Sequence, residues 1–159
     1  MSKVCFIGHR DYCGDVEILK NVIEKEIEQG ANFFTMGTHG NFDSSALIQC
    51  KKLREKYKCL EIQIVITSFN SIKKQLLYDD EWGKEYFTPY SDVETVMYEI
   101  EECYFKRRIT ESNKKMIDNC DTLICYVNAN QKYGGSKIAM QYAHKKGLKV
   151  INLFNDNFE

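Results

Sequence analysis

Three short loops in this sequence carry glycine beside residues that can bind phosphate, and each loop follows an apolar run typical of a buried β-strand. They are Gly8-His9-Arg10, Gly37-Thr38-His39-Gly40-Asn41-Phe42-Asp43 and Gly134-Gly135-Ser136. Glycine lets backbone amides approach a ligand closely, and the N-terminus of a following helix favours an anion. Because the carboxyl ends of parallel strands share one edge, these loops predict one site for a nucleotide or a nucleotide-derived molecule.

The first and third loops have the parts of a phosphate site. Arg10 offers a planar fork of donors for phosphate or carboxylate, although the same tripeptide also fits a plain turn with an exposed arginine. Gly134, Gly135 and Ser136 open a predicted helix, where backbone amides and the helix dipole favour an anion. The alternative there is a glycine turn in which Ser136 only caps the helix.

The second loop contains the candidate catalytic residue, Asp43. Its carboxylate either caps the following helix or grips a ribose hydroxyl or positions a water molecule. His39 is either a proton carrier, since histidine titrates near neutral pH, or a solvated loop side chain. We retain both interpretations of each residue.

The elements that must position these loops alternate along the chain. Apolar runs predict strands at residues 3–7, 32–36, 60–67, 122–127 and 148–154. Helical spacing predicts helices at residues 15–29, from 43 or 44 to 57, 110–119 and 136–146, with Gly30 and Gly147 as C-terminal caps. This order predicts an α/β fold, a doubly wound and mostly parallel sheet flanked by helices.

Two segments do not fit that alternation. Residues 92–103 are either a helix or an extended segment. Residues 68–90 hold the only tryptophan and the only proline, with helical character around 72–77. Long irregular segments are often functional. The aromatic part of this one, 78–90, either forms a protein interface or closes over a base by stacking.

Composition limits the classes of function. The chain has 159 residues and a net charge of −1, which suits one domain over 1–159 and argues against binding to duplex nucleic acid or a membrane surface. The short basic run Lys106-Arg107-Arg108 is interpreted as a solvated helix face. We expect a cytoplasmic protein whose seven scattered cysteines are reduced, with no metal and no cofactor, and a homo-oligomer is left open.

The same loops, taken with two later segments, resemble the SLOG superfamily, a Rossmann-like group that includes the LOG phosphoribohydrolases, the DprA nucleotide-fold domain and the YpsA-like proteins. The later segments are Asn113-Lys114-Lys115-Met116-Ile117-Asp118-Asn119-Cys120-Asp121 and the stretch from Ala143 to Leu153. The likeness is closest to small stand-alone YpsA-like proteins of bacteria and phages. It implies a SLOG fold that binds a nucleotide or nucleotide derivative, with Asn113 among the site residues.

The sequence departs from the LOG enzymes where they carry out their chemistry. The resemblance implies an arginine next to an asparagine, paired with a glutamate shortly after the last glycine loop. Here Ser112 precedes Asn113, and Ala139 stands near the glutamate position. We therefore do not expect hydrolysis of the LOG kind.

Three interpretations follow. The first is a binding module that senses, carries or sequesters a nucleotide-derived molecule. The second is an enzyme that cleaves or transfers a ribosyl or deoxyribosyl bond, with Asp43 as the carboxylate and Glu81 or Glu85 as less suitable candidates. The nucleoside deoxyribosyltransferases, which have a related fold, share a pattern like that from Asp121 to Ala143. The third is a partner-binding protein that uses the aromatic segment.

Overall fold

The computed structural model describes residues 2–67, 92–100, 105–130 and 134–154, and all structural statements refer to these. The irregular stretch 68–90 lies outside them, including its aromatic part 78–90 with Glu81 and Glu85, as do Cys103 and Tyr133. The strands are β1 (Ser2–Gly8), β2 (Ala31–Met36), β3 (Glu61–Val65), β4 (Glu94–Val96), β5 (Thr122–Tyr126) and β6 (Lys149–Asn152). The helices are α1 (Val16–Glu28), α2 (Asn41–Lys56), α4 (Phe105–Asp118) and α5 (Gly135–Lys146).

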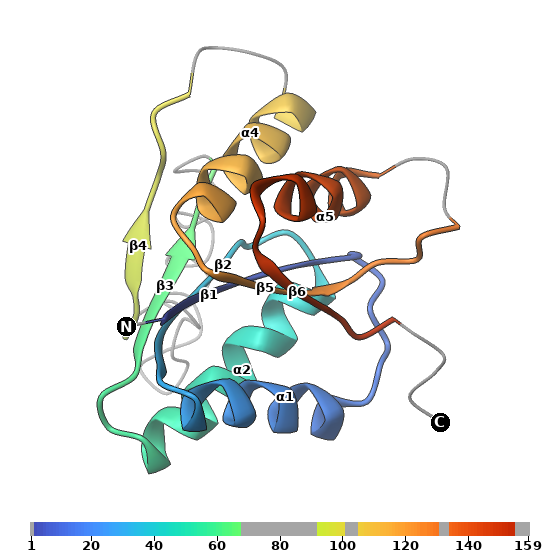
Figure 1. Cartoon of the computed structure of the whole chain (residues 1–159). Coiled ribbons are helices and arrows are strands. Elements are labelled where there is room, and N and C mark those ends of the chain that lie inside the picture. Colours follow the sequence, from blue (N-terminus) through green and yellow to red (C-terminus); the bar gives the residue numbers. More distant parts are fainter. Residues whose placement is uncertain (1, 68–91, 101–104, 131–133, 155–159) are drawn as a thin grey trace, which may run out of the picture.

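The strands form one six-stranded sheet in the order β4-β3-β2-β1-β5-β6, and every neighbouring pair is parallel. Helices α1 and α2 cover one face, and α4 and α5 cover the other (Figure 1). The predicted doubly wound α/β fold is confirmed. The chain order reverses between β1 and β5, the place where ligands bind in many open parallel sheets.

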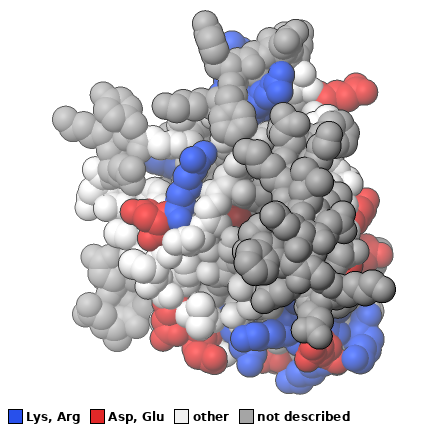
Figure 2. All heavy atoms as spheres, turned by 180° about the vertical axis from the view of Figure 1, so that it is seen from behind, with Lys and Arg blue, Asp and Glu red and all other residues white. Residues whose placement is uncertain are grey.

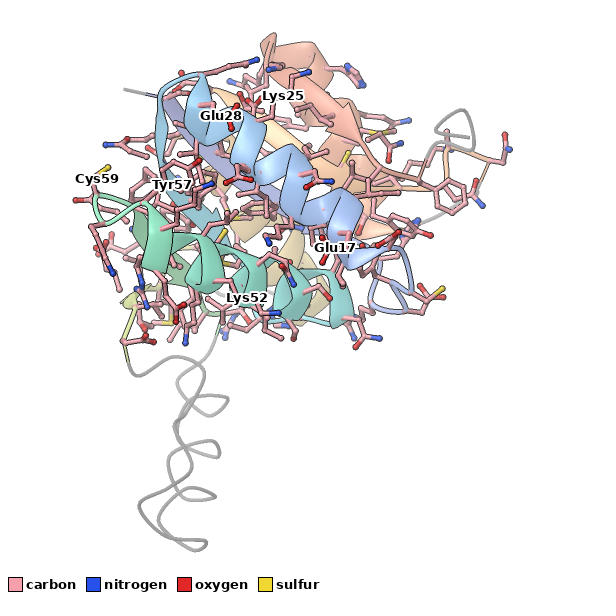
Figure 3. The ribbon with its side chains drawn as sticks, turned by 90° about the horizontal axis from the view of Figure 1, so that it is seen from below. Glu17, Lys25, Glu28, Lys52, Tyr57 and Cys59 are labelled. Atoms are coloured by element: carbon pink, nitrogen blue, oxygen red, sulfur yellow. The ribbon has the colours of Figure 1, made fainter. Side chains whose placement is uncertain are left out.

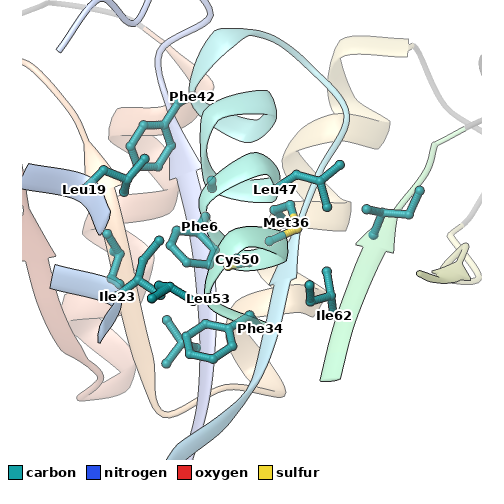
Figure 4. Packing of buried hydrophobic residues seen from close by; sticks show 14 of the residues in the cluster. Phe6, Leu19, Ile23, Phe34, Met36, Phe42, Leu47, Cys50, Leu53 and Ile62 are labelled. Carbon is teal, nitrogen blue, oxygen red and sulfur yellow. The ribbon is translucent and has the colours of Figure 1, made fainter. Parts of the chain in front are cut away.

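Alternating side chains of the central strand divide the core into two layers. Val4 and Phe6 pack toward α1 and α2 (Figure 4), whereas Cys5 and Ile7 belong to the layer under α4 and α5. A strand buried on both faces reads as a continuous apolar run, which is why this strand was found from the sequence. Helices α1 and α2 lie side by side beneath the sheet (Figure 3), and Glu24 of α1 accepts hydrogen bonds from Lys56 and Tyr57 at 2.9 and 3.0 Å.

Several predicted elements differ from the structure in their boundaries, among them the strand predicted at 60–67, which ends at Val65. Helix α2 begins at Asn41 because Gly40, with φ 126°, ends the preceding loop there. Helix α4 begins at Phe105, five residues before the predicted start at residue 110, so the basic run Lys106-Arg107-Arg108 belongs to its first turn. The last strand is shorter than predicted, ending at Asn152, and the ambiguous segment after residue 91 forms the extended strand β4. Gly147 caps α5 in the left-handed conformation, as predicted.

Four of the six described cysteines are buried in the core, where they pack as small apolar side chains. Cys5, Cys50, Cys120 and Cys125 are buried, Cys13 and Cys59 are exposed, and none of these six is in a disulfide. Burial raises the pKa of Cys125 to about 12, so its reactive thiolate form is scarce at neutral pH. Within the described ranges we find no group of three or more His, Cys, Asp or Glu residues able to hold a metal ion, and no helix long and apolar enough to cross a membrane.

Candidate functional site

All three glycine loops lie at one edge of the sheet. They follow the carboxyl ends of β1, β2 and β5, and these strands are parallel. His9 links two of these ends, since its backbone N–H donates to the carbonyl of Tyr126 at 3.2 Å and its Nε2 accepts the N–H of Asn128 at 2.8 Å. These two hydrogen bonds hold the carboxyl ends of β1 and β5 together, at the place where the strand order reverses. A role of His9 in ligand binding stays a prediction.

Gly8 is required by packing. A Cβ there would lie 2.4 Å from Cγ of Phe42, whose ring is fully buried. The ring of Phe42 stacks on Tyr126 and meets Tyr12 edge-on, with centroids 6.3 and 5.1 Å apart. The three aromatic rings thus pack beneath the first two loops. The absence of a side chain at Gly8 makes room for the ring of Phe42.

Gly40 and Arg10 bring the first and second loops together. The N–H of Asn41 donates to the carbonyl of Arg10 at 2.9 Å, and a Cβ on Gly40 would lie only 2.6 Å from Cα of Arg10. This close approach, together with a φ of 126°, favours glycine at position 40. The Arg10 side chain is exposed, and its guanidinium has no ion pair or hydrogen bond with the described part of the chain.

Asp43 is buried in the first turn of α2. Its Oδ2 accepts the backbone N–H of His39 at 3.0 Å, and a Cβ on Gly37 would lie 2.9 Å from the same oxygen. Burial raises the pKa of Asp43 to about 6, opposed by the His39 N–H and by the positive charge of Arg10. The carboxyl therefore pins the second loop to α2 and changes charge near neutral pH.

His39 connects the second loop to β3. Its Nε2 shares a hydrogen bond with Oγ1 of Thr67 at 3.1 Å. Burial, and then the charge of Arg10, lowers the pKa of His39, so its ring is neutral at pH 7. Thr67 was not selected from the sequence, although it is the last residue of the strand predicted at 60–67 and lies just beyond the carboxyl end of β3. The rule used to find the glycine loops also applies to this position.

Asn113, on α4, lies beside His39 and Thr67. A small gap is lined by Gly37, His39, Thr67, Ser112 and Asn113 together with apolar side chains, and its volume of about 10 Å³ is at the lower limit for one water molecule. Asn113, selected through the resemblance, is thus next to the second loop. Ser112 and Ala139, at the positions of the LOG charged pair, are both buried.

Thr38 has a polar atom that the described protein leaves unsatisfied. Its Oγ1 is buried and hydrogen-bonds to none of the described residues. Such a group costs about 1–3 kcal/mol of folding free energy. A ligand oxygen or an ordered water molecule within the loop would satisfy it.

We therefore expect Thr38→Val to affect stability and ligand binding in opposite directions. Valine keeps the shape and removes the unsatisfied hydroxyl, so the unliganded variant should be at least as stable as the wild type in urea unfolding. If the hydroxyl serves the ligand, nucleotide affinity measured by calorimetry should fall. Thr95→Val, on exposed β4, is the matched control and should change neither property. Unchanged affinity in Thr38→Val would exclude Thr38 from the site.

The third loop forms the N-terminus of α5. Gly134 is the N-cap, no side chain of the described residues caps the helix, and a Cβ on Gly135 would meet none of them within 4 Å. Ser136 is inside the first turn, so the structure does not support the alternative in which it is the N-cap. An uncapped first turn beside open space presents backbone N–H groups suited to an anion.

No family model and no curated protein sequence matches this chain. Its structure is similar to that of DNA processing protein A (DprA) from Streptococcus pneumoniae, with a TM-score of 0.62 and 18% sequence identity. The similarity covers 94% of this chain and 49% of the DprA chain, so this protein spans about half the length of DprA. The fold is therefore Rossmann-like and resembles that of DprA.

Proposed function

We propose that the carboxyl edge of the sheet binds a nucleotide or nucleotide-derived small molecule, and that the protein senses, carries or sequesters it in the manner of stand-alone YpsA-like SLOG proteins. The observation that carries the proposal is that Arg10, exposed and without an ion pair or hydrogen bond to the described residues, lies at the same edge as the N-terminus of α5, which no described side chain caps. A phosphate would meet a charged fork and helix amides there.

The second loop suits the sugar of such a ligand. Thr38 offers an unsatisfied hydroxyl, and Asn113 and Thr67 line the gap beside His39. Hydroxyl and amide groups of this kind recognise ribose hydroxyls by hydrogen bonding. Asp43 holds the second loop in position, because its carboxyl accepts the backbone N–H of His39.

The charge distribution favours a small ligand over duplex nucleic acid. The net charge is −1, and on the face shown in Figure 2 lysines and arginines are mixed with acidic residues along its lower edge. Duplex binding relies on a field of one sign over many phosphates.

A panel of nucleotides and the melting temperature of the purified protein test the proposal. A ligand at 100 times its dissociation constant adds about 2.7 kcal/mol of stability, which raises the melting temperature by roughly 5–10 °C in a chain of this size. Inorganic phosphate is the control for simple ionic effects. Absence of a shift with every nucleotide would end the proposal.

One observation favours a second candidate, an enzyme that cleaves or transfers an N-glycosidic bond. The raised pKa of Asp43 resembles that of groups tuned for proton transfer or nucleophilic attack. Against it, the LOG charged pair is replaced by Ser112 and Ala139, so neither a cation nor a carboxylate is available at those positions to stabilise charge as the base departs.

We accordingly expect no release of free base when the protein is incubated with nucleoside monophosphates and followed by chromatography. Release at catalytic rates that disappears in Asp43→Asn would make the protein an enzyme with Asp43 as its carboxylate. Release that persists in that variant would point to a contaminant or to a different catalytic group.

A further inference from the structure

A second hollow lies beyond Thr67, at the carboxyl ends of β3 and β4 and beneath the start of α4. Its walls are mainly apolar, from Ile66, Met97, Tyr98 and Ile100. Thr67, which also lines the small gap beside His39, belongs to both spaces. The hollow is therefore adjacent to the region proposed for the sugar.

The size of this hollow suits one part of a ligand. Its volume is about 210 Å³, below the roughly 300–1,000 Å³ of pockets that hold a whole drug-sized molecule. Arg10 follows β1 and Thr67 follows β3, and two strand spacings span roughly 10 Å. That separation is comparable to the reach of a mononucleotide from phosphate to base.

Two opposite charges lie at this hollow without neutralising each other. Glu99 and Arg108 both line it, yet neither forms an ion pair with the described residues. Met97, in the same wall, is 45% exposed and so presents apolar surface to the hollow. An apolar wall beside an unpaired acceptor and an unpaired donor suits a flat heterocycle with both kinds of group on its edge.

We propose, resting on the nucleotide-binding function above, that this hollow receives the base and that Glu99 and Arg108 favour guanine. Guanine presents N–H donors at N1 and N2, which a carboxylate accepts as a pair, and acceptors at O6 and N7, which arginine recognises. Adenine has no N–H at N1 and no carbonyl at C6, so it satisfies Glu99 and Arg108 less completely.

The test compares three ligands that share a sugar phosphate: GMP, AMP and ribose 5-phosphate. In calorimetry, wild-type protein should bind GMP more tightly than AMP and ribose 5-phosphate. Glu99→Gln should weaken GMP binding roughly tenfold or more, because a charged acceptor of two N–H groups is lost, and should leave ribose 5-phosphate unchanged. Glu94→Gln, with the same charge change on exposed β4, should behave as the wild type.

The outcomes separate the two proposals. If none of the three compounds binds, both the nucleotide-binding proposal for these ligands and the proposed base site are wrong. If all three bind equally well, or if Glu99→Gln weakens GMP and ribose 5-phosphate alike, only the base site is wrong. Tighter binding of AMP than of GMP would overturn the preference for guanine.

Discussion

Asp43→Asn is expected to stabilise the protein at neutral pH, by an amount that shrinks as the pH falls. The carboxyl is buried, with a pKa raised from 3.8 to about 6. Well below the unfolded pKa of 3.8 it is protonated in both the folded and the unfolded protein, so burying it carries no charge penalty. As the pH rises through 6, the folded protein must hold a buried carboxylate, and stability is lost.

The shift of about two units corresponds to roughly 3 kcal/mol at pH 7, since one unit is about 1.4 kcal/mol. Asparagine is neutral throughout and can still accept the N–H of His39. The difference in unfolding free energy between variant and wild type should therefore grow from near zero at pH 4 to a few kcal/mol at pH 7. The lowered pKa of His39 acts in the opposite direction, because a buried imidazolium is disfavoured as the pH falls. That contribution is shared by both proteins.

Urea unfolding at several pH values between 4 and 7.5 measures this difference directly. Asp11→Asn makes the same charge change at an exposed position and should show little dependence on pH. A difference for Asp43→Asn that stays constant across the range would show that Asp43 is not a buried acid. A stable Asp43→Asn variant would also be the reagent needed to test for N-glycosidic chemistry.

Most of the fold was predictable because most of its strands and helices leave a local signal in the sequence. Strand β1 is buried on both faces and reads as one apolar run, and Gly147 marks the end of α5 with a left-handed residue. The start of α4 had a weaker signal, since Phe105 and Ile109 are separated by three basic residues and no N-cap residue was recognised before them. Strand β4 is short and at the edge of the sheet, so its sequence showed no long alternation.

The site was predictable only as a set of loops. Sequence reasoning placed Arg10, Gly37, His39, Gly40 and Asp43 at one edge, and the structure brings them into contact or close proximity. The sequence could not distinguish a glycine that leaves room for a ligand from one that leaves room for another side chain of the protein. Gly8 is of the second kind, because the ring it accommodates comes from a residue 34 positions later, Phe42. Long-range contacts of this sort leave no local pattern.

Thr67 shows the opposite case, a residue that the edge rule could have found. It follows the carboxyl end of β3 and bonds to His39, but it has no glycine next to it. A search restricted to glycine loops therefore missed the polar side chain that joins the second loop to the neighbouring hollow.

Arg10→Ala is expected to weaken nucleotide binding without weakening the fold. The guanidinium is exposed and forms no hydrogen bond or ion pair with the described residues, so its removal takes away only its electrostatic effect on Asp43 and His39. A hydrogen bond to a charged group contributes about 1.5–3 kcal/mol, which corresponds to a roughly 10- to 150-fold loss of affinity. Unfolding free energy should stay within about 0.5 kcal/mol of the wild type.

Calorimetry with GMP and with guanosine separates the phosphate from the rest of the ligand. Arg10→Ala should lose affinity for GMP and keep that for guanosine, because only the phosphate meets the arginine. Arg10→Lys, which retains the charge but not the planar fork, should lie between the variant and the wild type. Lys52→Ala removes one positive charge on the outer side of α2 (Figure 3) and should bind GMP as the wild type does. If Arg10→Ala bound GMP with unchanged affinity, the phosphate would have to lie elsewhere along the edge, with the amides at the start of α5 as its remaining donors.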